Sequence, residues 1–238
     1  MVVSLFPLTT QGAMVRRRGN VLIGPVDLTL SGQGVTVVIG PNGAGKSSLL
    51  QMLYGLSRLS GGSVNWACDA REAQRRLAFV FQTPVVLRRS VLENVIYPLR
   101  IVGRPREEAL ALGREWCTRI GLGEATDRSA TVLSRGEKQK LALARALITR
   151  PDALFLDEPC ASLDGSATRE IEALLQTASD EGTRLILATH DMGQARRLAN
   201  DVIFLLRSKV HETGTAPAFF DGPRTAQARA FLAGDIVE

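Results

Sequence analysis

The chain lacks features that would point to a membrane-spanning, secreted or metal-binding protein. No apolar run approaches the roughly 18 residues that a helix needs to cross a bilayer. The N-terminal region is unlike a signal peptide, because the basic residues 16–18 follow its short apolar stretch instead of preceding it. The three cysteines, Cys68, Cys117 and Cys160, have no metal-ligand spacing, which is typical of proteins from a reducing cytoplasm.

Repetition is missing as well, since the sequence contains no internal repeat and no low-complexity segment. Its 238 residues, 45% of them hydrophobic, suit one ordinary compact α/β unit. The formal net charge of +5 leaves an acidic partner open, either nucleic acid or anionic lipid headgroups. Basic clusters such as Arg88–Arg89 are, however, more often solvated surface than a recognition site.

The most informative pattern that is present is a glycine-rich loop. It reads Gly40-Pro41-Asn42-Gly43-Ala44-Gly45-Lys46-Ser47-Ser48 and contains the phosphate-binding pattern G-x-x-x-x-G-K-[ST]. A β-branched run typical of a buried parallel strand precedes it at Val35–Ile39, and helically spaced leucines follow it. This order places phosphates at a helix N-terminus. We therefore expect a nucleoside triphosphate site, with Lys46 on the terminal phosphates and the Ser47 hydroxyl on Mg²⁺.

Strands and helices alternate along the rest of the chain. Short apolar stretches at 21–23 and 26–30 read as antiparallel strands. Further strands are expected at 63–67, 77–81, 153–156, 185–188 and 202–206, and helices at 69–76, 90–99, 106–120, 137–148 and 167–181, with two short helices at the C-terminus. Pro105 suits the first turn of the helix at 106–120. The alternation predicts a mostly parallel sheet covered on both faces.

Two acids, Asp157 and Glu158, end the apolar strand Ala153–Leu156. Ligands bind at the carboxyl edge of a parallel sheet, where such strands end. An Asp at this place can hold the Mg²⁺ that bridges nucleotide phosphates, and a neighbouring Glu can activate a water. The plain alternative is an exposed strand end capped by acids, which the upstream phosphate loop disfavours.

Further motifs resemble those of a known family. Leu133-Ser134-Arg135-Gly136-Glu137 precedes a helix, Ser162-Leu163-Asp164 follows the acidic strand end, and His190 follows the strand expected at 185–188. Together with Gln82, they resemble the full motif set of an ATP-binding cassette (ABC) ATPase, over essentially the whole chain. The resemblance implies a P-loop NTPase (RecA-like) parallel-sheet core with an antiparallel β subdomain and a helical signature subdomain. It also implies a single ABC ATPase domain over 1–238, with the helical subdomain at 83–135.

The resemblance assigns roles to these residues. Gly40–Ser48 would cradle ATP, Ser47, Gln82 and Asp157 would surround Mg²⁺, and Glu158 would be the catalytic base. His190 would contact the γ-phosphate. Ser134, Gly136 and Glu137 would belong to the signature loop that meets ATP bound by the opposite subunit of a head-to-tail homodimer, and Asp164 would couple the two sites.

The chain departs from the family pattern in two places. The signature usually reads Leu-Ser-Gly-Gly-Gln, whereas Arg135 and Glu137 stand here, and Ser134 and Gly136 remain. An aromatic residue usually stacks on adenine near residues 15–18, whereas this chain has Val15 and the arginines 16–18. A guanidinium can stack on a base.

The resemblance also suggests a place in the cell. The chain looks like the ATPase subunit of an importer, at the cytoplasmic face of the cell membrane, with a separate permease and, indirectly, a solute-binding protein as partners. Residues 81–91 resemble importers of oxyanions, especially tungstate, with phosphate and molybdate importers near. The alternatives are an ATPase subunit of an exporter and a soluble ATPase linked to nucleic acid, although no nucleic-acid partner is expected.

Overall fold

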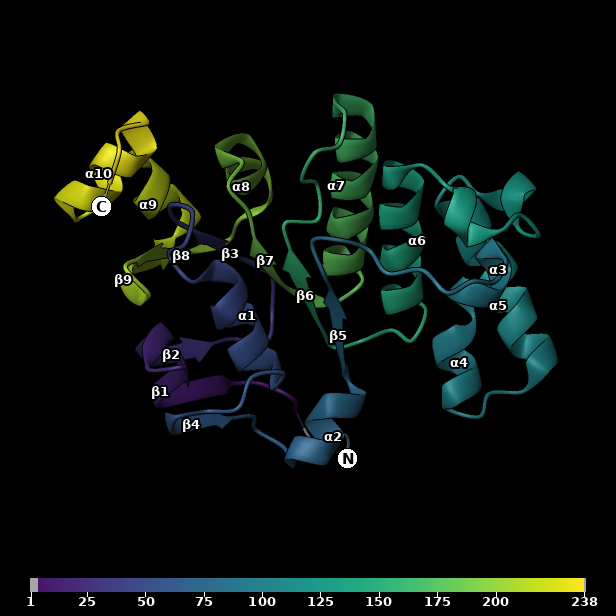
Figure 1. Cartoon of the computed structure of the whole chain (residues 1–238), viewed down its shortest axis with the longest axis horizontal. Coiled ribbons are helices and arrows are strands. Elements are labelled where there is room, and N and C mark those ends of the chain that lie inside the picture. The colour runs from purple at the N-terminus through teal and green to yellow at the C-terminus, as the bar shows by residue number, and fades with distance from the viewer. Residues whose placement is uncertain (1–3, 238) are drawn as a thin grey trace.

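A computed structural model describes residues 4–237 and places two β-sheets against each other, with helices around them (Figure 1). The larger sheet is 6-stranded. Its order is β5 (Leu77–Val80), β6 (Ala153–Asp157), β7 (Arg184–Ala188), β3 (Val35–Ile39), β8 (Asp201–Leu206) and β9 (Lys209–Thr215). Neighbouring strands in this order are parallel except β9, which is antiparallel to β8. Strands β3, β6 and β7 are buried throughout, as their apolar sequences require.

The smaller sheet is antiparallel, in the order β2 (Asn20–Leu30), β1 (Leu8–Arg17) and β4 (Gly61–Asn65). Strands β1 and β2 form a hairpin whose two turn residues, Arg18 and Gly19, have φ of 51° and 84°. Positive φ at both positions is what a tight two-residue hairpin needs. Leu22 is an extra residue in β2, because Val15 pairs with Ile23 whereas Arg16 pairs with Val21.

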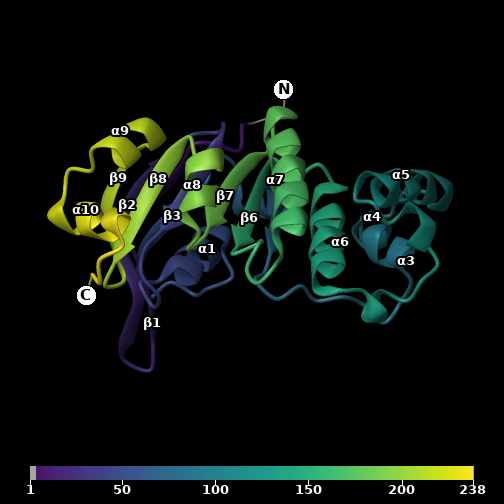
Figure 2. The same ribbon diagram turned by 90° about the horizontal axis from the view of Figure 1, so that it is seen from above.

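Helices cover the large sheet and extend it at both ends. Helices α1 (Lys46–Tyr54), α7 (Gly165–Asp180) and α8 (Met192–Leu198) follow the parallel strands β3, β6 and β7. Beyond α6 (Arg135–Leu147) lies a helical segment made of α3 (Val91–Val95), α4 (Tyr97–Ile101) and α5 (Arg106–Arg119). In both views this segment lies at the end opposite to α9 (Ala216–Asp221) and α10 (Ala226–Ala233) (Figures 1 and 2). The short helix α2 (Ala70–Arg75) precedes β5.

The hydrophobic core consists of two clusters, one on each side of the large sheet. The first joins Val37 and Leu156 to α6, α7 and the helical segment. The second joins Val38 and Phe155 to α1 and the antiparallel sheet. Adjacent residues of one strand thus pack into different clusters, because side chains alternate across a sheet. Within residues 4–237, no helix has the length and apolarity that crossing a membrane requires.

The expected fold class is confirmed, with local corrections. The helix expected at 90–99 is two helices that meet at Ile96, because the ring and missing N–H of Pro98 disfavour an uninterrupted helix. Pro105 is the residue just before α5, not part of its first turn. The stretches at 21–23 and 26–30 form one continuous strand, β2, whose antiparallel partner is β1, and β1, β9 and α8 were not expected.

Candidate functional site

The phosphate loop joins β3 to α1 and depends on its glycines. Gly40 has a φ of 149°, and a Cβ there would lie 2.3 Å from the carbonyl oxygen of Leu205. Gly45, with a φ of 98°, would bring a Cβ within 2.8 Å of the carbonyl oxygen of Leu22. Such contacts would force the backbone to shift, so both positions require glycine. The loop is therefore held against β2 and β8, and glycine-rich loops of this kind present backbone N–H groups to an anion.

Lys46 begins α1, and its side chain is buried under the loop. Its Nζ donates hydrogen bonds to the carbonyl oxygens of Gly40, at 2.9 Å, and Pro41, at 3.2 Å. Burial lowers the pKa of Lys46, and the nearby carboxylates of Glu158 and Asp157 oppose this shift. The ammonium group is thus held by weak neutral acceptors, which the oxygens of a phosphate would replace favourably.

Asp157 ends β6 directly beside the loop. Its Oδ1 accepts a hydrogen bond of 2.9 Å from the Ser47 hydroxyl, and the residue is only 5% exposed. Burial raises the pKa of Asp157, the hydrogen bond from Ser47 opposes this shift, and the charge of Glu158 adds to it. A buried carboxylate with one neutral hydrogen-bond donor is an electrostatic cost to the free protein, and a bound cation would relieve that cost.

Glu158, Gln82 and His190 come together at the carboxyl ends of β6, β5 and β7. The Oε2 of Glu158 accepts a hydrogen bond of 3.0 Å from Gln82 Nε2 and lies 3.1 Å from His190 Nδ1. Glu158 has a φ of 47°, which is uncommon for a residue with a side chain, and its N–H donates to the carbonyl oxygen of Ala188. Two residues that are distant from Glu158 in sequence, Gln82 and His190, therefore converge on its carboxylate.

A cavity of about 300 Å³ runs along the phosphate loop. It is lined by Val21, Leu22, Asn42, Gly43, Gly45, Lys46, Ser47, Ser48, Glu158 and Ser208. The loop and Glu158 were expected there, whereas Val21, Leu22 and Ser208 were not. Ser208 and its neighbour Arg207 form the β8–β9 turn, with φ of 59° and 49°. The sequence carried no signal for this turn, because glycine usually occupies positions of positive φ.

The signature residues lie outside this cavity. Ser134 caps α6: its Oγ accepts from the N–H of Glu137 at 3.2 Å, and its own N–H donates to Glu137 Oε2 at 2.7 Å. These bonds from Ser134 lower the pKa of Glu137. A Cβ at Gly136 would be 3.3 Å from that of Ala167 in α7, so the two helix starts are in close contact.

Asp164 holds the start of α7 in the same way. Its Oδ1 accepts hydrogen bonds from the N–H groups of Ser166, at 2.9 Å, and Ala167, at 2.8 Å. Because Ala167 also faces Gly136, the signature loop and the loop that contains Asp164 are packed together. The chain thus presents one group of expected residues around the cavity and a second group, Ser134, Gly136, Glu137 and Asp164, away from it.

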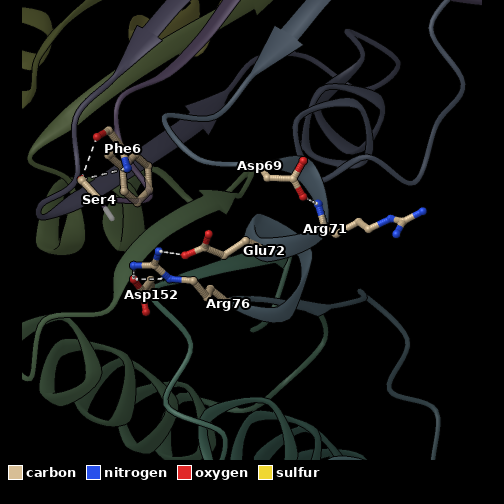
Figure 3. Close-up of polar contacts among 7 residues, drawn as sticks. All are labelled: Ser4, Phe6, Asp69, Arg71, Glu72, Arg76 and Asp152. Atoms are coloured by element: carbon tan, nitrogen blue, oxygen red, sulfur yellow. Dashed lines mark hydrogen bonds and ion pairs between the residues drawn. The ribbon is translucent and has the colours of Figure 1, made fainter. Parts of the chain in front are cut away.

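A larger cavity, of about 950 Å³, lies at the opposite edge of the large sheet, where β5, β6 and β7 begin. Figure 3 shows the polar contacts of Arg76 and Asp152, two residues of its wall. Its wall includes Arg76, whose guanidinium binds Asp152 and lies 3.4 Å from Glu72. Another wall residue, Arg119, pairs with Glu181 at 2.9 Å. These cations are balanced by acids, and none of the expected site residues lies here. The phosphate loop and Glu158 line the smaller cavity instead.

The residues beside the smaller cavity fit a Mg²⁺ ion. The Ser47 hydroxyl, the Asp157 carboxylate and the amide oxygen of Gln82 are hard oxygen donors, which Mg²⁺ prefers. Ser47 and Asp157 are already in contact at the strand end, and burial leaves Asp157 in need of a positive partner. Mg²⁺ is usually bound through one or two carboxylates together with substrate phosphates, and this arrangement provides the protein's part of such a site.

Comparison with known proteins gives matches over most of the chain. A family model described as ABC transporter matches residues 23–161. The tungstate uptake ATP-binding protein TupC of Peptoclostridium acidaminophilum is 38% identical over 85% of this chain and 94% of that protein. The phosphate import ATP-binding protein PstB 2 of Natronomonas pharaonis is 35% identical, over 92% of this chain and 84% of that protein.

Two solved structures are similar in fold. One, from Clostridium perfringens, is part of the ABC transporter complex cbiONQ, with a TM-score of 0.80, 25% identity and coverage of 92% of both chains. The other is a dimeric ATP-binding cassette in a post-hydrolysis state bound to ADP and Pi. It has a TM-score of 0.77 and 26% identity, and covers 88% of this chain and 98% of that one.

Proposed function

This chain belongs to the ABC transporter family and is one of its ATP-hydrolysing subunits, and from that premise we propose that it powers uptake of a small oxyanion through a separate permease. Import is supported by relatives named as tungstate uptake and phosphate import subunits. The oxyanion is supported by the same names and by the sequence of residues 81–91. We place the subunit at the cytoplasmic face of the cell membrane, held there by the permease.

The observation that carries the proposed chemistry is the position of Glu158. Its carboxylate lines the phosphate cavity and contacts both Gln82 and His190. We assign it as the general base that takes a proton from the water attacking the γ-phosphate. His190 and Gln82 hold its Oε2, so the carboxylate is positioned before ATP arrives. We assign His190 as a contact of the γ-phosphate, the role that the family resemblance gives it.

The remaining residues of the candidate site, in the cavity wall and beside it, bind and orient the nucleotide. Lys46 exchanges its two carbonyl partners for the β- and γ-phosphate oxygens, and the loop N–H groups surround the same phosphates. Ser47, Asp157 and Gln82 would hold Mg²⁺, which when bound neutralises charge that develops on the phosphates. Burial of Lys46 and Asp157 keeps water from screening these interactions.

We assign the second group of residues to a composite site between two copies of the chain. Ser134 and Gly136 stand at the N-terminus of α6, where a hydroxyl and backbone N–H groups favour an anion. They lie outside the chain's own cavity, so a head-to-tail homodimer would let them meet the partner's ATP. Gly136 and Asp164 both contact Ala167. This would connect the signature loop, which meets the partner's ATP, to Asp164, the residue assigned to couple the two sites.

We assign the permease contact to the exposed part of residues 83–104. Five apolar residues of this segment are buried in the core: Val91, Leu92, Val95, Ile96 and Leu99. Val85, Ile101 and Val102 stay outside and are 66%, 68% and 70% exposed. The guanidinium of Arg145 donates to the Val85 carbonyl oxygen at 2.6 Å, which connects this surface to the signature helix α6.

The test of the proposed chemistry is Glu158→Gln. The amide keeps the shape of the side chain but cannot accept a proton, so ATP hydrolysis should fall by a factor of about 10² or more while ATP still binds. The variant should accumulate as an ATP-dependent homodimer in size-exclusion chromatography. Glu124→Gln, a matched change at an exposed glutamate remote from the cavity, should behave as the parent protein. Near-normal turnover of Glu158→Gln would refute the assignment.

A further inference from the structure

The start of α8 has an incomplete version of a cap that this chain completes elsewhere. At α3 and α6, a glutamate three residues after the capping serine accepts a hydrogen bond from the N–H of that serine. Asp191 caps α8 with the same spacing to Gln194, and its Oδ1 accepts from the Gln194 N–H at 3.0 Å. The N–H of Asp191 instead donates to Thr189 Oγ1 at 3.1 Å. The side chain of Gln194 therefore has no part in the cap.

The amide of Gln194 is buried without a partner. The residue is 1% exposed, and within residues 4–237 neither its Oε1 nor its Nε2 has a hydrogen-bond partner. An unpaired amide in a protein interior destabilises the fold, and methionine, which has a similar shape, would not carry this cost. A polar side chain kept at such a place needs an explanation, and a partner in a second conformation of the protein provides one.

The side chain of Gln194 lies beside Cys160, in the loop between Glu158 and Asp164. Burial raises the pKa of the Cys160 thiol to about 11, and the neighbouring Gln194 amide opposes this rise. The thiol can donate through S–H and accept through sulfur, which matches the two unpaired atoms of the amide. In this structure the two groups are neighbours that do not form a hydrogen bond.

The loop that contains Cys160 is strained at two positions. Glu158 and Ser162, on either side of Cys160, have φ of 47° and 59°, in the left-handed region that residues with a side chain rarely adopt. Such strain collects at sites that change conformation. The carbonyl oxygen of Cys160 accepts from the N–H of Leu163 at 3.3 Å, so a shift of the thiol is passed to the backbone just before Asp164.

Gln194 is also connected to His190. Asp191, whose carboxylate binds the Gln194 N–H, is the next residue after His190, and the His190 ring contacts the carboxylate assigned as general base. The rest of α8 is fixed independently, because Arg197 binds Glu172 of α7 through two hydrogen bonds of 2.8 and 2.7 Å. The amide of Gln194 is therefore not needed to hold α8 in place, and it stands where a movement of His190 can reach the neighbouring loop.

We propose that Gln194 is a positioning residue that links the loop of His190 to the loop of Asp164 through a hydrogen bond between its amide and the Cys160 thiol. The inference rests on the proposed nucleotide site and homodimer. The bond is absent in the free chain and forms when ATP and the second copy hold His190 and Asp164. A contact that exists in only one of two states shifts the equilibrium toward that state. Gln194 thereby makes hydrolysis depend on both loops being in place.

The experiment compares the parent protein with Gln194→Met, which keeps the shape of the side chain and removes the amide. Without nucleotide, Gln194→Met should raise the melting temperature by about 2–4 °C, because it removes an unpaired buried group. By calorimetric titration, the ATP affinity of the monomer should stay within about twofold, whereas turnover at saturating ATP should fall about fivefold. In the Glu158→Gln background, the same change should weaken the ATP-dependent homodimer by a similar factor. Gln176→Met, at an exposed glutamine of α7, is the matched control and should change none of these properties.

A double-mutant cycle tests the partner of the amide. Cys160→Ala should reduce turnover about as much as Gln194→Met does, and the double variant should be no slower than either single variant. Cys160→Ser keeps a donor and an acceptor at the same place, so it should retain the turnover of the parent protein.

Several results would overturn the linking role. Turnover of Gln194→Met within about twofold of the parent protein, or a fall in its melting temperature, would mean that the amide is an ordinary buried group with a partner, such as a water, in the free chain. A loss of monomer ATP affinity equal to the loss of turnover would overturn the role too, as would additive effects of the substitutions at Gln194 and Cys160. Failure of the parent protein to bind ATP would instead overturn the proposed nucleotide site, and a Glu158→Gln protein that stays monomeric in ATP would overturn the homodimer.

Discussion

Replacing Asp157 by asparagine should stabilise the free protein while removing its activity. Asp157 is 5% exposed, its carboxylate accepts a hydrogen bond from the Ser47 hydroxyl, and the charge of buried Lys46 acts on it favourably. The amide oxygen of asparagine can accept the same hydrogen bond from Ser47. Asp157→Asn therefore removes the cost of a buried charge and keeps the local geometry, but it deletes the anionic oxygen proposed to hold Mg²⁺.

The gain in the free energy of unfolding should be about 1–2 kcal/mol at neutral pH. Burying an ion costs several kcal/mol, and attraction to Lys46 returns part of this cost. For a chain of this size, the melting temperature should rise by about 2–8 °C. Because the folded-state pKa of Asp157 is raised, protonation stabilises the fold at acid pH, and this contribution is lost as pH rises through that pKa. The gain should therefore shrink as pH falls.

The assay is thermal unfolding of parent and variant, without nucleotide, at several pH values between about 4 and 8. Mg²⁺-dependent ATP hydrolysis should be measured on the same samples. Asp235→Asn, at an exposed aspartate, is the matched control and should change neither property. A variant less stable than the parent at neutral pH would refute the reasoning, because it would show that the carboxylate contributes net stability to the free protein. Retained Mg²⁺-dependent hydrolysis would refute the metal assignment.

Lys46→Ala should weaken ATP binding by about 10–150-fold, because it removes a charge-assisted contact worth roughly 1.5–3 kcal/mol. An ATP affinity within about twofold of the parent protein would contradict the assignment of Lys46 to the phosphates. Ser134→Arg should leave ATP binding to the monomer intact and abolish hydrolysis, whereas loss of monomer binding would indicate a role within its own chain or in folding. A cysteine at Val102 should cross-link to a cytoplasmic loop of the permease, and one at Ile236, which is 92% exposed at the other end of the molecule, should not (Figure 1). Cross-links from Ile236→Cys alone would mean that the segment 83–104 is only structural.

Strand β3 and the phosphate loop could be predicted from the sequence because their signals lie within short stretches of consecutive residues. Val35–Ile39 is a β-branched run between polar residues, and the loop after it needs glycine at particular places, so strand and loop can be recognised without tertiary information. Asp157 and Glu158 were found for a similar reason, since an apolar strand ending in two acids indicates the carboxyl edge of a parallel sheet.

The elements that were missed depend on contacts between distant segments. Strand β9 is rich in polar residues and forms because it pairs with β8. The turn between them consists of Arg207 and Ser208 and contains no glycine, so nothing in the sequence indicated it. Leu22 lines the cavity because its bulge brings β2 against the phosphate loop. Helix α8 is short and begins with a hydrogen bond from the N–H of Gln194 to Asp191, a capping signal that sequence reasoning could have used.

The order of strands in the large sheet also separates the candidate site residues from the helical segment. Gln82, Glu158 and His190 stand at the ends of β5, β6 and β7, which are neighbours in the sheet, while the chain between β5 and β6 forms the helical segment at one extremity (Figure 2). The chain leaves the sheet at the end of β5, forms the helical segment and α6, and returns to the neighbouring strand β6. Under the permease assignment proposed above, the helical segment could therefore change in sequence and length to fit another permease without moving the strand ends at which we place ATP hydrolysis.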